Sequence, residues 1–263
     1  MSALTFDGTA GLYDRAGADL SRLFIPALLE AARVRSGDRV LDVATGTGLA
    51  AEAALARVGS SGRVVGADLS VPMLARARDR LAARGAWVVA ADGQALPFRP
   101  GRFDVILCQL GLMFFPSPAS GLTEFHRVLR AGGRVAVCVL TRPDRMLYAR
   151  VFTAIARHRA THAGTPARLC SLGDPARLEA LLSGAGFGNV SLGRETREVG
   201  FPSAADYWAV VEAGAGLAGQ AYLELGPGER RAVRDEVLGQ LAGGATGGRL
   251  TFPVETLVAA GER

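Results

Sequence analysis

The chain has 263 residues, of which 49% are hydrophobic, 21% charged and 6% aromatic, a globular composition that excludes intrinsic disorder. All 30 basic residues are arginine, so the sequence excludes a P-loop lysine and every enzyme that needs a lysine Schiff base. The net charge of +5 comes from dispersed arginines without interleaved aromatic side chains, which argues against a nucleic-acid partner.

The three cysteines, Cys108, Cys138 and Cys170, are too few and too widely spaced for a disulfide framework or a zinc knuckle. No apolar run reaches the roughly 18 residues of a membrane span, and the N-terminal segment, with Asp7 and Asp14, lacks the apolar core of a signal peptide. We therefore expect a cytoplasmic protein with no membrane span and no nucleic-acid partner. The sequence leaves a homodimer open.

Apolar periodicity predicts a first helix over residues 17–34, which Pro26 would break into two pieces. Strands and helices then alternate as far as residue 140, and the strands are continuous apolar runs. This pattern is typical of a mostly parallel sheet with helices on both faces, a doubly wound, Rossmann-like α/β fold. The predicted strands are 39–43, 63–68, 87–91, 103–109 and 133–140, and the predicted helices are 49–58, 71–84 with Ser70 as its N-cap, and 118–130.

After residue 141 the pattern changes to a helix-rich segment with two late strands. We expect these strands to complete the sheet in the order 3-2-1-4-5-7-6, and the helices to form a cap over its carboxyl edge. The chain is then one domain with an N-terminal helical lid (1–35), a cofactor-binding core (36–141) and a third part that completes the sheet and carries the cap (142–263). The predicted late helices are 145–163, 174–184, 203–218 and 227–242, the strands are 189–199 and 249–259, and 243–248 is a glycine-rich hinge.

A glycine-containing loop follows the first predicted strand, and Gly46 and Gly48 allow its backbone to turn sharply and approach a ligand. Asp42, Asp68 and Asp92 stand at or near the ends of the first three strands. These ends lie side by side at the crevice where open α/β sheets bind ligands. There the Asp68 carboxylate could bind two ribose hydroxyls and Asp92 the adenine amino group, so the pattern indicates an adenosine site.

The charge at the loop distinguishes two adenosine cofactors. A dinucleotide would place its pyrophosphate near Asp42, which costs energy, whereas the ammonium and sulfonium of S-adenosylmethionine are attracted there. Ala51 also occupies the position of the third glycine of a dinucleotide motif. The sequence therefore favours S-adenosylmethionine, and it leaves a nicotinamide oxidoreductase and a non-methylating S-adenosylmethionine binder or cyclase as alternatives.

Four motifs in this order resemble the class I S-adenosylmethionine-dependent methyltransferases, in particular the group related to the ubiquinone/menaquinone-biosynthesis enzymes. The chain departs from that pattern at Ala44, where the family usually has glycine, and at Ala131, where it usually has proline. Both replacements are small and remove no side-chain ligand. The motifs are Leu41-Asp42-Val43-Ala44-Thr45-Gly46-Thr47-Gly48, then residues 65–70, residues 91–98 with 102–104, and residues 127–134.

The resemblance implies S-adenosyl-L-methionine as cofactor and assigns roles to individual positions. Backbone groups of the glycine loop would line the methionine part, an acid would bind ribose, and two apolar residues would sandwich adenine. The implied positions are Ala44, Thr45 and Gly46 for methionine, Asp68 for ribose, Leu69 and Met73 for the adenine faces, Asp92 and Gly93 for its edge, the Gln109 carbonyl for the ammonium, and Tyr13 as the aromatic that closes over the cofactor.

The stretch after the fourth strand is apolar, with Leu110, Met113 and Phe114 as candidate substrate-binding residues. Such a wall suits a small, partly apolar acceptor, although plain core packing is an equal alternative. Residue 109 is not a carboxylate that could hold a catalytic Mg²⁺, and no Asn/Asp-Pro-Pro-Tyr motif is present. We expect methyl transfer to an O, C or N atom of a small molecule of secondary metabolism, without a metal.

His158 and His162 are four residues apart on the helix predicted over 145–163 and would share one face. Arg159 stands where a zinc-binding helix motif has glutamate, so a metal site is disfavoured. The two histidines are candidates for a general base, and the alternative is that both are exposed polar positions on an amphipathic helix.

Overall fold

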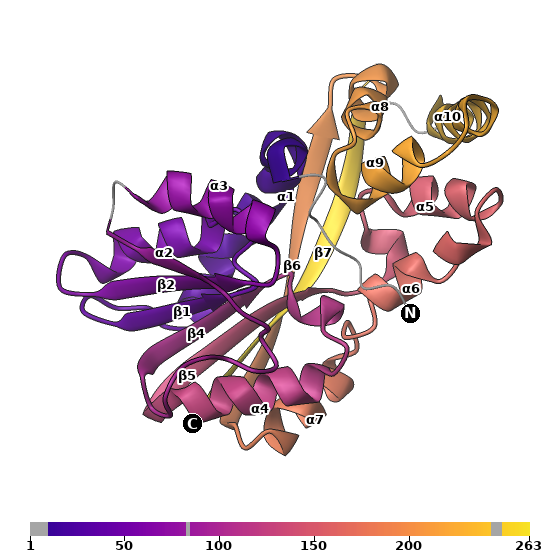
Figure 1. Cartoon of the computed structure of the whole chain (residues 1–263). Coiled ribbons are helices and arrows are strands. Elements are labelled where there is room, and N and C mark those ends of the chain that lie inside the picture. The colour runs from indigo at the N-terminus through magenta and orange to yellow at the C-terminus, as the bar shows by residue number, and fades with distance from the viewer. Residues whose placement is uncertain (1–9, 83–84, 243–248) are drawn as a thin grey trace.

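A seven-stranded sheet runs through the molecule, with the strand order β3-β2-β1-β4-β5-β7-β6 (Figure 1). The computed structural model describes residues 10–82, 85–242 and 249–263, so the predicted hinge at 243–248 lies outside the described residues. β1 to β5 are parallel, and β7 pairs antiparallel with both β5 and β6, which confirms the predicted fold class and order. The strands are β1 (Arg39–Val43), β2 (Arg63–Asp68), β3 (Trp87–Ala90), β4 (Phe103–Gln109), β5 (Leu129–Leu140), β6 (Gly188–Phe201) and β7 (Leu250–Glu262).

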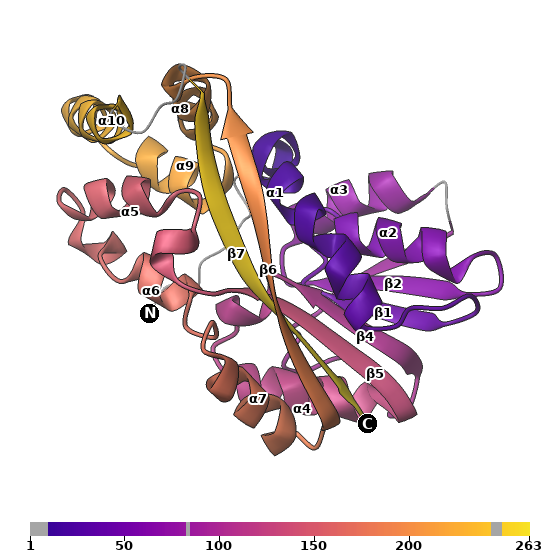
Figure 2. The same ribbon diagram turned by 180° about the vertical axis from the view of Figure 1, so that it is seen from behind.

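Helices cover both faces of the sheet, as continuous apolar strands require (Figures 1 and 2). α1 (Ala10–Ala31), α2 (Leu49–Val58) and α3 (Val71–Leu81) lie on one face, and α4 (Pro118–Val128) and α7 (Pro175–Gly184) lie on the other. The start of α3 follows the predicted chemistry, because the Ser70 hydroxyl accepts the amide of Met73.

Pro26 does not break α1, contrary to the sequence-based prediction. The residue is exposed, so water can satisfy the carbonyl that loses its helical partner. On the opposite side of the helix Phe24, Ile25 and Leu28 are buried against the sheet. Burial of this apolar face therefore outweighs the missing hydrogen bond.

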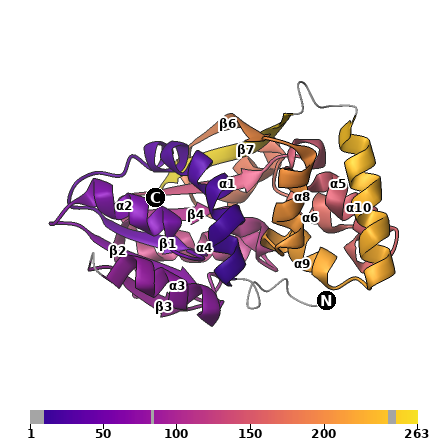
Figure 3. The same cartoon turned by 90° about the horizontal axis from the view of Figure 1, so that it is seen from above.

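The β6–β7 hairpin extends past the rest of the sheet and carries part of the cap (Figures 2 and 3). β7 pairs with β6 along its whole length, but with β5 only from Glu262 back to Thr256. The cap helices are inserted at two places in the chain, between β5 and β6 and between β6 and β7 at the tip of the hairpin. They are α5 (Ala149–Ala156) and α6 (Thr165–Leu169) in the first insertion, and α8 (Ala204–Glu212), α9 (Gly216–Leu223) and α10 (Pro227–Ala242) in the second.

Two of the predicted cap helices are interrupted. The segment expected to be one helix over 145–163 contains only α5 and flanking 3-10 turns. Residues 157–163 have no buried apolar side chain whose packing would stabilise a longer helix. The helix expected over 203–218 is split into α8 and α9 at Gly214 and Gly216, which both have positive φ angles.

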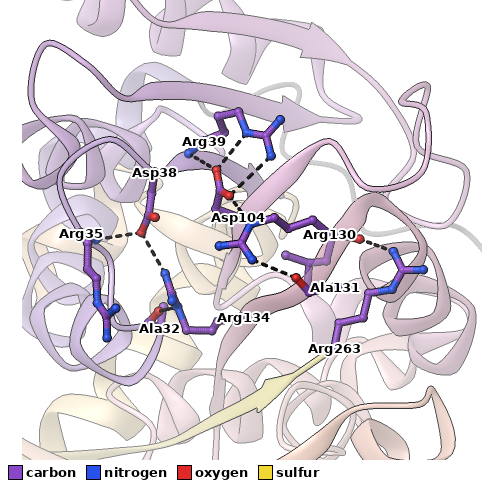
Figure 4. A network of polar contacts seen from close by, with 10 residues as sticks. Ala32, Arg35, Asp38, Arg39, Asp104, Arg130, Ala131, Arg134 and Arg263 are labelled. Atoms are coloured by element: carbon purple, nitrogen blue, oxygen red, sulfur yellow. Dashed lines mark hydrogen bonds and ion pairs between the residues drawn. The ribbon is translucent and has the colours of Figure 1, made fainter.

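A network of arginines and acids ties the strands together at the amino edge of the sheet (Figure 4). Asp104, at the start of β4, accepts hydrogen bonds from Arg39 of β1 and Arg130 of β5. Burial alone would raise the pKa of Asp104, but these hydrogen bonds outweigh it and lower the pKa to about 2. Beside it, Arg134 of β5 binds Asp38 at 3.0 Å and the carbonyl of Ala32, just after α1, at 2.9 Å. Every acid in this network therefore has a cationic partner.

Replacing Asp104 by asparagine should lower the free energy of unfolding by on the order of 2 kcal/mol at neutral pH. Because the folded state holds the pKa of Asp104 below its ordinary value, the stabilisation is complete above about pH 4 and disappears as the pH falls towards 2. Urea unfolding of both proteins across this range should show the difference shrinking with acidity. The exposed Asp144→Asn is the matched control, and equal losses for the two variants would contradict the prediction.

Candidate active site

The Asp42 carboxylate is buried at the carboxyl end of β1 and has no exposed surface. Its Oδ2 accepts the hydroxyl of Thr45 at 2.6 Å and the amide of Ala51 at 3.0 Å. The pKa of Asp42 is raised to about 7, mainly because burial disfavours the charged carboxylate. The two hydrogen bonds act in the opposite direction, and the nearby charge of Asp68 adds to the increase. Its Oδ1 is buried and has no hydrogen-bond partner among the described residues.

Gln109, at the carboxyl end of the neighbouring β4, presents a second acceptor of the same kind. The residue is 9% exposed, and its Nε2 donates to the carbonyl of Ser21 in α1 at 3.3 Å. Its Oε1 is buried and, within the described part of the chain, without a partner. The sequence analysis assigned a role to the backbone carbonyl of Gln109 and missed the side chain, because nothing in the sequence places Ser21 beside it.

A small pocket joins these two acceptors to the glycine loop and to α1. The predicted methionine-binding positions are brought together here, and Ser21 is an additional wall that the sequence analysis did not find. The pocket is lined by Ser21, Asp42, Ala44, Thr45, Gly46, Thr47, Leu49, Ala50 and Gln109.

Asp68 lies at the tip of β2 and is hydrogen-bonded to the same loop. One carboxylate oxygen accepts the amide of Gly46 and the other the amide of Ser70, both at 2.8 Å. These bonds fix the orientation of the carboxylate next to the pocket. The tip of β2 is therefore joined directly to the glycine loop through Asp68.

The segment after β3 is held by its own side chains. Asp92 accepts the backbone amide of Gln94 at 2.9 Å and its side-chain amide at 3.2 Å. Gln94 in turn accepts the amide of Ser117 at 2.9 Å. Gly93 has a structural reason to be glycine, since a Cβ there would lie 2.3 Å from the ring of Phe115. The adenine roles of Asp92 and Gly93 stay predictions.

The two residues expected to enclose adenine differ in accessibility. Leu69 is 67% exposed at the strand tip, whereas Met73 in the first turn of α3 is 3% exposed. Leu69 is thus open to a ligand, and Met73 would contribute only a small part of its surface. Tyr13 belongs to α1, but its side chain lies outside what the structure describes.

The predicted acceptor wall forms a 3-10 turn, η2 (Leu112–Phe114), against which α6 of the cap packs. Leu110 has a φ of 52°, a left-handed conformation that is costly for a leucine and is concentrated at functional sites. Leu110 and Phe114 are half-buried, but Met113 is 5% exposed and part of the core. Met113 thus packs in the core, and the substrate role of all three residues stays a prediction.

The two histidines do not share a helix face, contrary to the sequence-based expectation. α5 ends at Ala156, so His158 lies beyond it and His162 ends a separate 3-10 turn, η4 (Ala160–His162). His162 faces Glu224 at 3.7 Å, and His158 is exposed near Glu229. The described contacts of both histidines are thus with the cap, and the role of general base stays a prediction.

Comparison with known proteins assigns the family. Residues 41–137 match the family model described as "Methyltransferase domain". Over 280 aligned residues the chain is 32% identical to the nocamycin O-methyltransferase of Saccharothrix syringae, and the alignment covers 95% of each protein. The chain belongs to the class I S-adenosylmethionine-dependent methyltransferases.

Other methyltransferases match over a smaller part of the sequence. The chain is 39% identical to the demethylmenaquinone methyltransferase of Mycolicibacterium vanbaalenii over 154 residues, which are 57% of this chain and 64% of that protein. The chain thus spans less than two thirds of the length of this quinone-modifying relative. A solved putative methyltransferase of Bacillus halodurans shares the fold, with a TM-score of 0.61, 22% identity, and coverage of 90% of this chain and 97% of that one.

The family implies S-adenosylmethionine as cofactor, and the pocket of this chain fits it. Asp42 and Gln109 present two buried acceptor atoms without donors, which an ammonium group with three N–H donors would satisfy. A pyrophosphate could satisfy neither atom, and the family assignment removes the nicotinamide alternative. Within the described residues no three His, Cys, Asp or Glu side chains gather as metal ligands, and no helix is long and apolar enough to cross a membrane.

Ala44, which lines the pocket, is in close contact with Gly111. Ala44 takes a left-handed conformation with φ of 56°, which glycine adopts at a lower cost than alanine. Its Cβ would lie 2.4 Å from a Cβ added at Gly111, and the sulfur of Cys108 would lie 3.1 Å away. The methyl group at position 44 therefore requires glycine at position 111.

Gly111→Ala should destabilise the protein by about 1–3 kcal/mol through this overlap. Ala44→Gly alone should change the stability by less than about 1 kcal/mol, since relief of the backbone strain offsets the extra freedom of the unfolded chain. The double variant should recover part of the loss, and contact with Cys108 limits the recovery. Urea unfolding of all four proteins measures the coupling, and strictly additive effects would refute the pairing.

Asp42→Asn should make the protein more stable than the parent at about pH 8, with the advantage shrinking towards pH 5. Because folding raises the pKa of Asp42 from about 4 to about 7, the parent loses stability as the pH rises through this window, and asparagine removes that loss. Thermal unfolding at several pH values tests the prediction, which fails if both proteins show the same pH profile.

Proposed function

We propose that this protein transfers the methyl group of S-adenosylmethionine to an oxygen atom of a small, partly apolar molecule of secondary metabolism. The observation that carries this proposal is the similarity to nocamycin O-methyltransferase along 95% of both chains. That alignment extends through the cap, whereas the alignment with the quinone methyltransferase accounts for little more than half of this chain. Specificity for the acceptor should follow the part of the chain that encloses it.

The cofactor supplies an activated methyl group on a sulfonium, so the protein's main task is to position the reactants and exclude water. In the proposed arrangement Asp42 and Gln109 accept from the ammonium, and the loop at Ala44–Gly46 lines the methionine chain. Asp68, oriented by its two backbone hydrogen bonds, accepts from the ribose hydroxyls. Asp42 then ionises beside two positive charges, which compensates for its burial.

The acceptor would lie between η2 and the cap. The three residues of η2 are apolar, and α6 of the first cap insertion packs against them. An apolar enclosure of this kind favours a ring-bearing or otherwise hydrophobic acceptor and disfavours bulk water. This proposed placement of the acceptor does not depend on whether the protein is a monomer or a homodimer.

The proposal is tested by incubating the protein with isotopically methyl-labelled S-adenosylmethionine and extracts of secondary metabolites. We expect S-adenosylhomocysteine to appear together with a labelled small molecule, whose O-methyl group is identified by mass spectrometry and NMR. A labelled C-methyl or N-methyl product would overturn the choice of atom. Product formation without S-adenosylhomocysteine would indicate a cyclase or another non-methylating role.

Asp68→Ala should weaken S-adenosylmethionine binding by roughly 1.5–3 kcal/mol, the range for hydrogen bonds to a charged group. Asp68→Asn, which keeps one acceptor oxygen and can still bind a loop amide, should lose less. Isothermal titration calorimetry measures both affinities, with circular dichroism as the check that the fold is retained. Unchanged affinity in a folded Asp68→Ala protein would rule out the ribose assignment.

A further inference from the structure

Gln109 bridges the pocket and helix α1. A backbone carbonyl only accepts hydrogen bonds, so the contact with the Ser21 carbonyl fixes which end of the Gln109 amide is the NH₂ group. The amide oxygen is consequently the atom that remains on the buried, unpartnered side among the described residues. The side chain therefore has one end on α1 and the other available to a ligand.

Asp42 presents its own unpartnered oxygen to the same pocket. Asp42 of β1 pairs with Leu107 of β4, and Gln109 is two residues further along, so both side chains lie on one face of the sheet. Both residues line the pocket together with Ser21. Two acceptors without donors require an occupant that donates at least two hydrogen bonds, as an ammonium group does.

We propose that Gln109 is a positioning residue. Its side chain holds α1 at the Ser21 carbonyl only when the amino group of the bound cofactor donates to the other end of the amide. The inference rests on the proposed function for the identity of the ligand. With an ammonium against Oε1, the amide is held from both sides and keeps its bond to Ser21. Without a donor, the buried oxygen is unsatisfied, and turning the amide towards water relieves this cost while breaking the bond to α1.

The other end of α1 is anchored in a way that does not depend on a ligand. Arg134 is 9% exposed, donates to the carbonyl of Ala32 at 2.9 Å and binds Asp38 at 3.0 Å. Pro26 lies between the two anchors and removes one hydrogen bond of the helix. The half before Pro26 should therefore respond to the cofactor's amino group, and the half after Pro26 should not.

The test compares two ligands by hydrogen–deuterium exchange of the full chain. S-adenosylhomocysteine carries the ammonium group, whereas 5′-methylthioadenosine retains the adenosine and lacks it. At saturation, S-adenosylhomocysteine should slow exchange of the amides of residues 20–25 by roughly tenfold, and 5′-methylthioadenosine should leave them unchanged. The amides of residues 28–32 should respond equally to both ligands.

Gln109→Met keeps the length of the side chain and removes both hydrogen bonds. This variant should still bind S-adenosylhomocysteine, roughly tenfold more weakly, but at saturation the ligand should no longer protect residues 20–25. Gln240→Met, an exposed change in α10, is the matched control and should behave as the parent. A purely structural role for Gln109 would loosen α1 equally with and without ligand and would leave the ligand-dependent difference in place.

Equal protection of residues 20–25 by the two ligands, or protection that persists in saturated Gln109→Met, would overturn the inference while leaving the proposed function intact. Failure of the unaltered protein to bind S-adenosylhomocysteine would overturn both. Protection that needs the ammonium and Gln109 together would establish the link.

Discussion

The Asp42 carboxylate lies in the interior at the end of β1, with one oxygen bonded to Thr45 and Ala51 and the other without a donor in the described structure. The bonded oxygen shapes the loop, because it holds the turn at Thr45 and the first turn of α2 to the strand. The other oxygen gives the pocket its electrostatic character. Burying an acid with an unpartnered oxygen costs stability and favours a cation beside it, so the glycine loop depends on Asp42 for its shape and, in the proposed arrangement, for its affinity for the ammonium group.

The pKa values of acids at the two edges of the sheet are shifted in opposite directions. At the amino edge, arginines bind Asp104 and hold its pKa near 2, and the same network ties β1, β4 and β5 together (Figure 4). At the carboxyl edge, the pKa of Asp42 is raised to about 7. Stabilising interactions at one edge thus allow the other to keep unsatisfied groups for a ligand, an asymmetry that agrees with ligand binding at the carboxyl ends of parallel strands.

The sequence predicted the elements that local pattern determines. The continuous apolar runs of β1, β2 and β4 have the predicted bounds, and Ser70 caps α3 as its hydroxyl chemistry suggests. The strand order was also inferred correctly, and it places Asp68 at the tip of β2 beside the glycine loop. Such features depend on short stretches of chain and on one topological rule.

Features that arise from tertiary packing were not predictable in the same way. Pro26 is a helix breaker by local rules, and only the buried face of α1 shows why the helix continues. The helix over 145–163 has good propensity but no apolar partner for its second half, so the two histidines do not share a face. The contact between Gln109 and Ser21 joins residues 88 apart in the sequence, and neither residue type signals it.

The cap accounts for the different extents of the alignments, which cover 57% of this chain with the demethylmenaquinone methyltransferase and 95% with nocamycin O-methyltransferase. Its helices leave the sheet at two places, and an aromatic cluster joins both insertions to the hairpin: Tyr207 of α8 stacks on Phe252 of β7 with ring centroids 5.0 Å apart and lies 5.5 Å from Tyr148, next to α5. Through α6 the cap also packs against η2. The proposed acceptor enclosure therefore combines η2, which lies within the matched domain at 41–137, with cap segments outside that domain, while the pocket of Asp42 and Gln109 is lined by residues of the domain and by Ser21 of α1. In the proposed arrangement, cofactor binding thus depends mainly on the matched domain, and the choice of acceptor depends mainly on the cap.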